Sequence, residues 1–178
     1  MIHVALFEPE IPPNTGNIAR MCAATEVPLH IVGQPAFRMD DRTVRRAGLD
    51  YWPHVNLSRH ENLAALKSSL GIASSGGSSF APDGPNGKDS PRLLCLTTKA
   101  RQLYTDYQYR PGDCILFGPE TRGLPEEILA AHAETCLTIP MRSPHVRSLN
   151  LANAVSIVMY EALRQLRWFD SQWHNQGK

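Results

Sequence analysis

Polar side chains that can bind a ligand gather in three loops, each directly after an apolar segment. The first loop, residues 8–20 (EPEIPPNTGNIAR), offers side-chain amides at Asn14 and Asn17 and a guanidinium at Arg20. Amides and guanidinium groups bind phosphates and hydroxyl groups through directional hydrogen bonds. The alternative is a structural role, because the prolines and Asn14 are typical of a turn that caps a helix.

The second loop, residues 117–125 (FGPETRGLP), combines two glycines with two opposite charges. Gly118 and Gly123 permit tight turns and a close approach of the backbone to a ligand, and Glu120 and Arg122 lie between them. The chain contains neither GxxxxGK[ST] nor GxGxxG, so the loop is not a phosphate-binding or dinucleotide fingerprint. A purely structural turn between a strand and a helix remains the alternative.

The third loop, residues 138–154 (TIPMRSPHVRSLNLANA), leads into an apolar helical stretch. Ser148 is a natural N-cap. Asn150 and Asn153 compete with helical hydrogen bonding, so they are poor choices for the first turn of a helix unless their side chains have a function. The alternative is that Ser148 caps the helix and does nothing else. No GxSxG motif supports a serine nucleophile, and no cysteine lies in a context that activates a thiolate.

The composition predicts one globular domain, residues 1–178, with 42% hydrophobic and 20% charged residues. A net charge of +1 gives no general attraction to nucleic acid, so any polyanion must bind locally. Four cysteines without a CxxC pair and seven histidines without HExxH indicate a reduced cytoplasmic protein without a metal. No apolar run approaches the ~20 residues of a membrane span, and the N-terminus lacks the basic region of an export signal.

Apolar runs alternate with stretches of helical period, which predicts an α/β fold with a mainly parallel sheet flanked by helices. The predicted strands are Ile2–Phe7, Leu29–Val32, Arg92–Thr97, Asp113–Phe117 and Cys136–Ile139, with a weaker one near Val55–Leu57. The predicted helices are Thr15–Ala24, Asp41–Gly48, Glu61–Leu70, Pro125–His132 and Asn150–Arg167. Gly71–Pro91, with five Gly, five Ser and three Pro, is predicted to be a flexible insertion. Ligands of open α/β sheets bind beyond the carboxyl ends of strands, where the three loops begin.

Four ordered segments resemble the SPOUT-class RNA 2′-O-ribose methyltransferases: EPEIPPNTGNIARMCAA, LTTK, FGPETRGLP and IPM…RSLNLANAVSIVMYEA. The resemblance is strongest to the small members that act at the wobble nucleotide of tRNA, and it runs from Ile2 to about Leu166 apart from the insertion. It implies a SPOUT fold with a C-terminal trefoil knot and an S-adenosylmethionine site inside the knot. It also implies a homodimer with active sites across the interface, and the tRNA anticodon loop as partner. Nothing in the periodicity indicates a knot, and true knots are rare.

The resemblance also assigns site residues. Donor binding falls to Leu96, Thr97, Gly118, Ile139, Met141, Ser148 and Leu149, and catalysis to Arg20, Glu120, Ser148 and Asn150. Tyr160 matches a tyrosine implicated in the function of the wobble enzymes. Independently of the resemblance, Asn14, Arg45, Arg46 and Arg147 are expected to contact RNA together with Tyr160. One departure is the loop 142–147, which is a residue longer than expected and leaves the register of Arg142 and His145 open.

Arg20 is expected to position the 3′-phosphate and ribose, because a guanidinium is a poor proton acceptor. Glu120 is expected to fix loop geometry or Arg20. Deprotonation of the 2′-hydroxyl then falls to a substrate phosphate, to water or to a transiently neutral Arg20.

Two alternatives to this function remain at the level of sequence. One is a 2′-O-methyltransferase that acts at another tRNA or rRNA position, since residues that bind the methyl donor do not identify the nucleotide that is methylated. The other is a non-catalytic RNA-binding module, against which the joint presence of Arg20, Ser148 and Asn150 argues. Arg45 and Arg46 lie on the predicted helix Asp41–Gly48 and form either a phosphate-binding patch or an ordinary solvated face.

Overall fold

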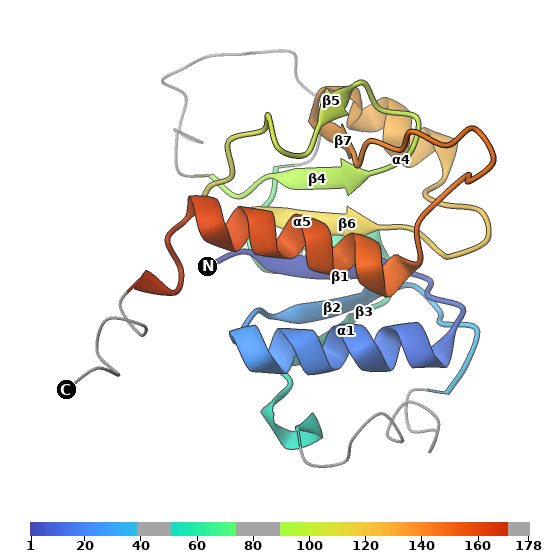
Figure 1. Ribbon diagram of the computed structural model, residues 1–178. Coiled ribbons are helices and arrows are strands. Elements are labelled where there is room, and N and C mark those ends of the chain that lie inside the picture. Colours follow the sequence, from blue (N-terminus) through green and yellow to red (C-terminus); the bar gives the residue numbers. More distant parts are fainter. Residues whose placement is uncertain (39–50, 74–89, 171–178) are drawn as a thin grey trace.

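The computed structural model describes residues 1–38, 51–73 and 90–170. Within these residues, seven strands form one sheet in the order β3-β2-β1-β6-β4-β7-β5, and every strand pair is parallel (Figure 1). The strands are β1 (His3–Phe7), β2 (Leu29–Val32), β3 (Leu57–His60), β4 (Leu93–Leu96), β5 (Gln102–Leu103), β6 (Cys114–Phe117) and β7 (Cys136–Thr138). The predicted parallel α/β sheet is confirmed.

Helices cover both faces of the sheet. The helices are α1 (Pro12–Thr25), α3 (Leu63–Leu70), α4 (Glu126–Ala131) and α5 (Leu151–Gln165), with short 3-10 turns η1 (Trp52–His54) and η2 (Ala133–Thr135). Figure 1 shows α1 and α5 side by side on one face. Leu66 of α3 and Leu129 of α4 pack in the apolar cluster on the opposite face.

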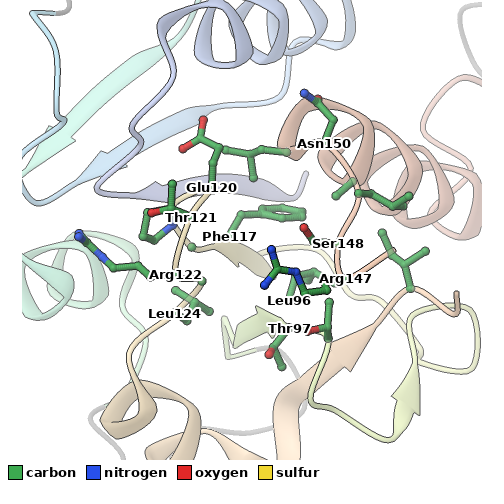
Figure 2. A pocket seen from close by; sticks show the side chains of 18 of the residues that line it. Leu96, Thr97, Phe117, Glu120, Thr121, Arg122, Leu124, Arg147, Ser148 and Asn150 are labelled. Carbon is green, nitrogen blue, oxygen red and sulfur yellow. The ribbon is translucent and has the colours of Figure 1, made fainter. Parts of the chain in front are cut away.

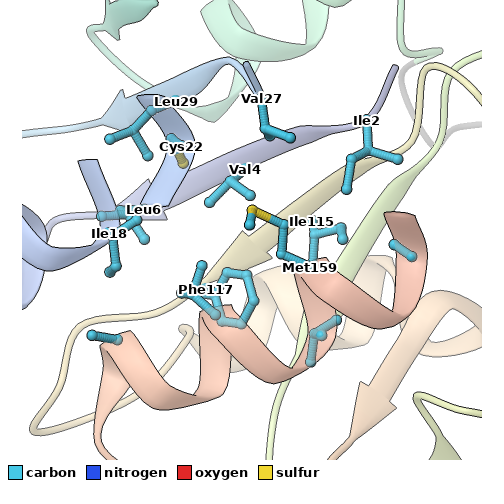
Figure 3. Close-up of a cluster of buried hydrophobic side chains, with 14 of the residues drawn as sticks. Ile2, Val4, Leu6, Ile18, Cys22, Val27, Leu29, Ile115, Phe117 and Met159 are labelled. Atoms are coloured by element: carbon cyan, nitrogen blue, oxygen red, sulfur yellow. The ribbon is translucent and has the colours of Figure 1, made fainter. Parts of the chain in front are cut away.

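Alternate strand residues feed two separate cores. Val4 and Leu6 pack against α1 and α5 together with Phe117 and Met159 (Figure 3), whereas Ala5 between them faces the cluster of α3 and α4. Both faces of the central strands are therefore buried, which explains their continuous apolar sequences.

The four cysteines are buried and form no disulfide. Burial raises the pKa of the Cys22 thiol to about 12. A thiolate is therefore unfavourable at that position, in agreement with the absence of a thiolate-activating context in the sequence.

Helix starts depart from the predictions for identifiable reasons. Helix α1 begins at Pro12 rather than Thr15, because prolines at the first two helical positions lack only N–H groups that the helix leaves unpaired anyway. Ser148 does not cap α5. The cap is Asn150, whose side-chain oxygen accepts hydrogen bonds from Ala152 N at 2.9 Å and Asn153 N at 3.3 Å.

Smaller elements were predicted less well. Strand β3 lies later than the predicted Val55–Leu57, and β5 and η1 were not predicted, because two or three residues are too short to show a period. In the predicted insertion Gly71–Pro91, Ile72 is 8% exposed and packs in the same cluster as Leu66, so the first residues of that segment belong to the fold.

Several predictions are left untested by the fold. The predicted helix Asp41–Gly48, with Arg45 and Arg46, and residues 74–89 of the insertion lie outside the described residues. The trefoil knot stays a prediction. In the described part of the chain, no helix is long and apolar enough to cross a membrane, and no group of three or more His, Cys, Asp or Glu side chains can hold a metal ion.

Candidate active site

A cavity of about 720 Å³ opens at the carboxyl ends of β4, β6 and β7 (Figure 2). The second and third loops form most of its wall, and the LTTK segment at the end of β4 contributes to it together with Ile11 and Asn14 of the first loop. All seven residues predicted to bind the donor line this cavity: Leu96, Thr97, Gly118, Ile139, Met141, Ser148 and Leu149. Segments far apart in the sequence therefore meet where the parallel sheet predicts a ligand.

Two carboxylates join the first loop to the second loop in a reciprocal way. Glu120 accepts hydrogen bonds from the backbone N–H of Glu10 at 2.8 Å and of Ile11 at 3.2 Å. Glu10 in turn accepts from the backbone N–H of Thr121 at 3.0 Å and from its hydroxyl at 2.7 Å. These two bonds from Thr121 hold the pKa of Glu10 below its usual value. We call Glu10, Glu120 and Thr121 the reciprocal clamp, since each loop's carboxylate binds the other loop's backbone.

A chain of polar side chains continues from the clamp to the third loop. The amide nitrogen of Asn14 donates to Glu120 at 3.0 Å, and the amide nitrogen of Asn150 donates to the Asn14 oxygen at 2.9 Å. A carboxylate only accepts, so it fixes which end of the Asn14 amide faces it. Asn14 is 6% exposed and uses both ends of its amide, which favours a positioning role over the predicted RNA contact.

Arg122 adds an ionic link between the first two loops. Its guanidinium lies 2.7 Å from the Glu8 carboxylate and 3.6 Å from that of Glu10. Glu8 has a left-handed backbone with φ of 44°, and its side chain fills the space beside Gly33. Gly33 has a φ of 74°, which L side chains rarely adopt, and a Cβ there would lie 2.8 Å from Glu8 Cγ, so glycine suits this arrangement best.

Gly118 is needed for a reason other than ligand space. A Cβ on Gly118 would collide with the backbone of Gly123 and Leu124 at the far end of the second loop. The glycine therefore lets the two ends of the second loop touch, and that contact shapes the wall of the cavity. The sequence suggested a close approach to a ligand, whereas the close approach in the structure is between two stretches of backbone.

The third loop presents free polar groups at the cavity. The Ser148 hydroxyl and the Arg147 guanidinium line the cavity, are exposed and form no hydrogen bond or ion pair within the described part of the chain. The other two cavity-lining cations are engaged, Lys99 with Glu126 at 2.7 Å and Arg122 as described above. Ser148 and Arg147 are therefore the polar groups best placed to meet a ligand.

Among the residues that the structure describes, two predicted site residues lie outside the cavity lining. Arg20 is exposed on α1, and its guanidinium carbon lies 5.6 Å from the ring centroid of Tyr51. Tyr160 on α5 is 48% exposed and stacks on Phe169, with ring centroids 6.0 Å apart. The sequence did not single out Glu10, Thr121 or Tyr51, because their contacts join segments with no shared local pattern.

A second cavity, of about 740 Å³, lies at the ends of β2 and β3, on the same edge of the sheet. Arg38 and Arg59 line it and are both exposed. Its wall also touches the first loop, because the Ala36 N–H donates to the Pro9 carbonyl at 3.1 Å. Cationic side chains therefore continue along this edge beyond the first cavity.

Comparison with known proteins places the chain in a family. The sequence model of the SpoU rRNA Methylase family matches residues 1–160. The chain belongs to this family. Among SpoU relatives, the tRNA (cytidine(34)-2′-O)-methyltransferase of Escherichia coli strain K12 is 45% identical over 167 residues, which cover 93% of this chain and 94% of the relative. The enzyme of the same name from Yersinia pestis is 44% identical over 167 residues, with the same coverage.

Solved SpoU structures share the fold. A structure described as giving insights into the 2-OH methylation of C/U34 on tRNA has a TM-score of 0.78 and 43% sequence identity. The match covers 94% of this chain and 97% of the chain in that structure. The SpoU methyltransferase AviRb from Streptomyces viridochromogenes, in complex with the cofactor AdoMet, has a TM-score of 0.71 at 23% identity, covering 93% of this chain and 60% of its own. The predicted SPOUT-type architecture is confirmed.

Proposed function

We propose that this chain transfers a methyl group from S-adenosylmethionine to the ribose 2′-hydroxyl of nucleotide 34, a cytidine or a modified uridine, in tRNA. The observation that supports it most is the gathering of the predicted donor residues around one cavity, with Ser148 and Asn150 beside them, in a chain 45% identical to an enzyme of that name. The three loops that the sequence singled out are thus parts of one site.

The cavity suits the proposed donor in size and chemistry. Its volume of about 720 Å³ lies in the usual range of small-molecule sites. Leu96, Ile139 and Leu149 offer apolar surface for an adenine ring, and the exposed Ser148 hydroxyl offers a hydrogen-bonding group. When bound, S-adenosylmethionine supplies a methyl group activated by its sulfonium centre.

The protein's own contribution is positioning. An in-line displacement needs the attacking oxygen held in one place and its proton removed as the bond forms. The Asn150 oxygen is engaged in capping α5 and one of its two amide hydrogens binds Asn14, so the second remains to orient a substrate oxygen. The Ser148 hydroxyl provides a second orienting group. Both Glu120 oxygens already accept hydrogen bonds, which suits the expected structural role.

Arg20 is proposed to act in the cavity of a second copy of the chain. Arg20 does not line the cavity of its own chain, and α5 leaves Ile157 and Tyr160 38% and 48% exposed. A homodimer that covers this helix brings the Arg20 of one protomer to the other protomer's site, where it positions the ribose and 3′-phosphate. Arg45, Arg46, Arg147 and Tyr160 are proposed to contact the anticodon loop.

The proposed reaction is tested by mapping 2′-O-methylated nucleotides in RNA from a deletion strain, with and without the gene restored. Loss of the methyl group at tRNA position 34, and its return with purified protein and S-adenosylmethionine, is the expected result. Loss of a methyl group at another tRNA or rRNA position would instead support the alternative function, methylation at that position. No loss, together with no donor binding in calorimetry, would contradict the enzymatic function.

The composite site is tested by mixing two inactive variants. Arg20→Ala and Asn150→Ala protomers, exchanged into mixed dimers, are expected to recover about a quarter of the wild-type rate, since half of the dimers are mixed and one of their two sites is intact. No recovery, with mixed dimers shown to form, would place Arg20 and Asn150 in the same protomer's site. Light scattering that shows a monomer would overturn the dimer itself.

A further inference from the structure

Tyr51 touches helix α1 at two points one turn apart. Its hydroxyl donates a hydrogen bond to the Gly16 carbonyl at 3.1 Å, and the Arg20 guanidinium carbon lies 5.6 Å from its ring centroid. Gly16 and Arg20 are four residues apart in an α-helix and therefore lie on the same side of it. The ring is thus anchored to the helix at one end and lies against the Arg20 side chain.

The backbone at Tyr51 is itself held in place. The Tyr51 carbonyl accepts a hydrogen bond from His54 N at 2.9 Å, which closes the turn η1, and η1 packs against α1. The ring is half-buried against the apolar cluster that contains Ile18. Tyr51 therefore presents a fixed surface to a long side chain that extends toward solvent.

The Tyr51 ring limits the positions from which Arg20 can meet a substrate. An exposed arginine samples many rotamers, and freezing them when a ligand arrives costs binding or rate. An aromatic face within about 6 Å of a guanidinium favours one arrangement by about 2- to 5-fold at an exposed site. The planar guanidinium also presents its hydrogen-bond donors in a fixed fork once its plane is set.

We propose that Tyr51 is a positioning residue for Arg20 and holds its guanidinium ready to bind the substrate ribose and phosphate. The proposal rests on the proposed function, in which Arg20 makes that contact. The Tyr51 hydroxyl is bonded to Gly16 and its ring lies against Arg20, so Tyr51 acts through Arg20 rather than on the ligand.

Two substitutions at Tyr51 separate the ring from the hydroxyl. Tyr51→Phe keeps the ring and loses the bond to Gly16, and its single-turnover methyl transfer to tRNA is expected to stay within about 3-fold of wild type. Tyr51→Leu removes the ring, and the rate at saturating tRNA is expected to fall about 5-fold with unchanged affinity for S-adenosylmethionine. Equal losses in both variants would overturn the proposal.

A matched control exists elsewhere in the chain. The Arg92 guanidinium carbon lies 4.8 Å from the ring centroid of Tyr107, at the amino end of the sheet and away from both cavities. Tyr107→Leu removes the same kind of contact and is expected to leave the methyl-transfer rate of the folded protein unchanged. A loss of rate in Tyr107→Leu equal to that in Tyr51→Leu would mean that general loosening, not Arg20, accounts for the effect.

A double-mutant cycle decides between a positioning role and a structural one. In the Arg20→Ala background, Tyr51→Leu is expected to cause no further loss of rate, because the group that it positions is gone. An equal loss in both backgrounds would overturn the proposal. If Arg20→Ala lowers the rate and Tyr51→Leu does not, only the proposal for Tyr51 fails. If Arg20→Ala keeps the wild-type rate, the role of Arg20 fails, and that of Tyr51 fails with it.

Discussion

Glu120→Gln is the smallest change that tests the reciprocal clamp. In the native protein one carboxylate oxygen accepts from Glu10 N, and the other accepts from Ile11 N and Asn14 Nδ2. A glutamine has nearly the same shape, but one of its two terminal atoms is a hydrogen-bond donor. Whichever way the amide turns, its NH₂ group faces at least one N–H. The substitution therefore places two donors against each other between the first and second loops.

The size of the effect follows from the number of bonds lost. In the better orientation the oxygen keeps Ile11 and Asn14, and the bond from Glu10 N is lost. Hydrogen bonds to charged groups contribute about 1.5–3 kcal/mol each, and an unsatisfied donor adds to the cost. We therefore expect the free energy of unfolding to fall by about 2 kcal/mol. The methyl-transfer rate is expected to fall at least about 10-fold, since the loops that hold Asn14 and Asn150 loosen.

Urea unfolding and single-turnover methyl transfer measure the two effects separately. Glu127→Gln is the matched control, because Glu127 is exposed on α4 and forms no hydrogen bond or ion pair within the described residues. It makes the same change of charge without touching the clamp. If Glu120→Gln unfolds at the same urea concentration as Glu127→Gln and reacts at the wild-type rate, the clamp does not hold the loops together.

Three further predictions concern the second loop, the start of α5 and the histidines. Gly118→Ala is expected to abolish donor binding in calorimetry, because its Cβ would collide with the backbone of Gly123 and Leu124. Gly123→Asn is expected to keep donor binding, because Gly123 has a φ of 69° and no atom lies within 4 Å of a Cβ placed there. Asn150→Asp retains the helix cap and loses the donor to Asn14, so it should slow methyl transfer with little change in the urea midpoint, while Asn150→Ala also loses about 1 kcal/mol of stability. Burial beside His3 and His60 lowers the pKa of His30 from 6.5 to about 4, so the unfolded chain binds more protons in this range. The contribution of neutral His30 to the free energy of unfolding is then fully present above about pH 6.5 and is lost as the pH falls toward 4. His30→Gln should therefore reduce the difference between the urea midpoints measured at about pH 7.5 and about pH 5.

The sheet could be predicted because its strands are buried on both faces. Such strands read as unbroken apolar runs, and for β1, β2 and β6 the predicted bounds differ from the observed ones by at most one residue. The short strand β5 has no such signal, since its two residues are held by pairing with β7 rather than by their own pattern. The start of α1 was placed too late because paired prolines resemble a turn until the helix that follows them is known.

The position of the site could also be predicted, but not its internal contacts. Polar loops that follow parallel strands must meet at one edge of the sheet, and the three loops do. The link from Glu10 to Thr121 spans 111 residues, and nothing in either segment indicates that the two face each other. The role of Asn14 shows the same limit, because its burial depends on α1 starting at Pro12 and on the approach of the third loop.

The residue type at position 150 follows from two demands that meet there. The start of α5 needs an acceptor for the N–H groups of Ala152 and Asn153, and the chain from the clamp needs a donor for the Asn14 oxygen. Serine has a single hydroxyl hydrogen and shorter reach, and aspartate only accepts. Asparagine meets both demands with one amide, its oxygen at the helix and its nitrogen at Asn14. The fold and the site are thus joined through one side chain, so α5 cannot shift without moving the group proposed to orient the substrate.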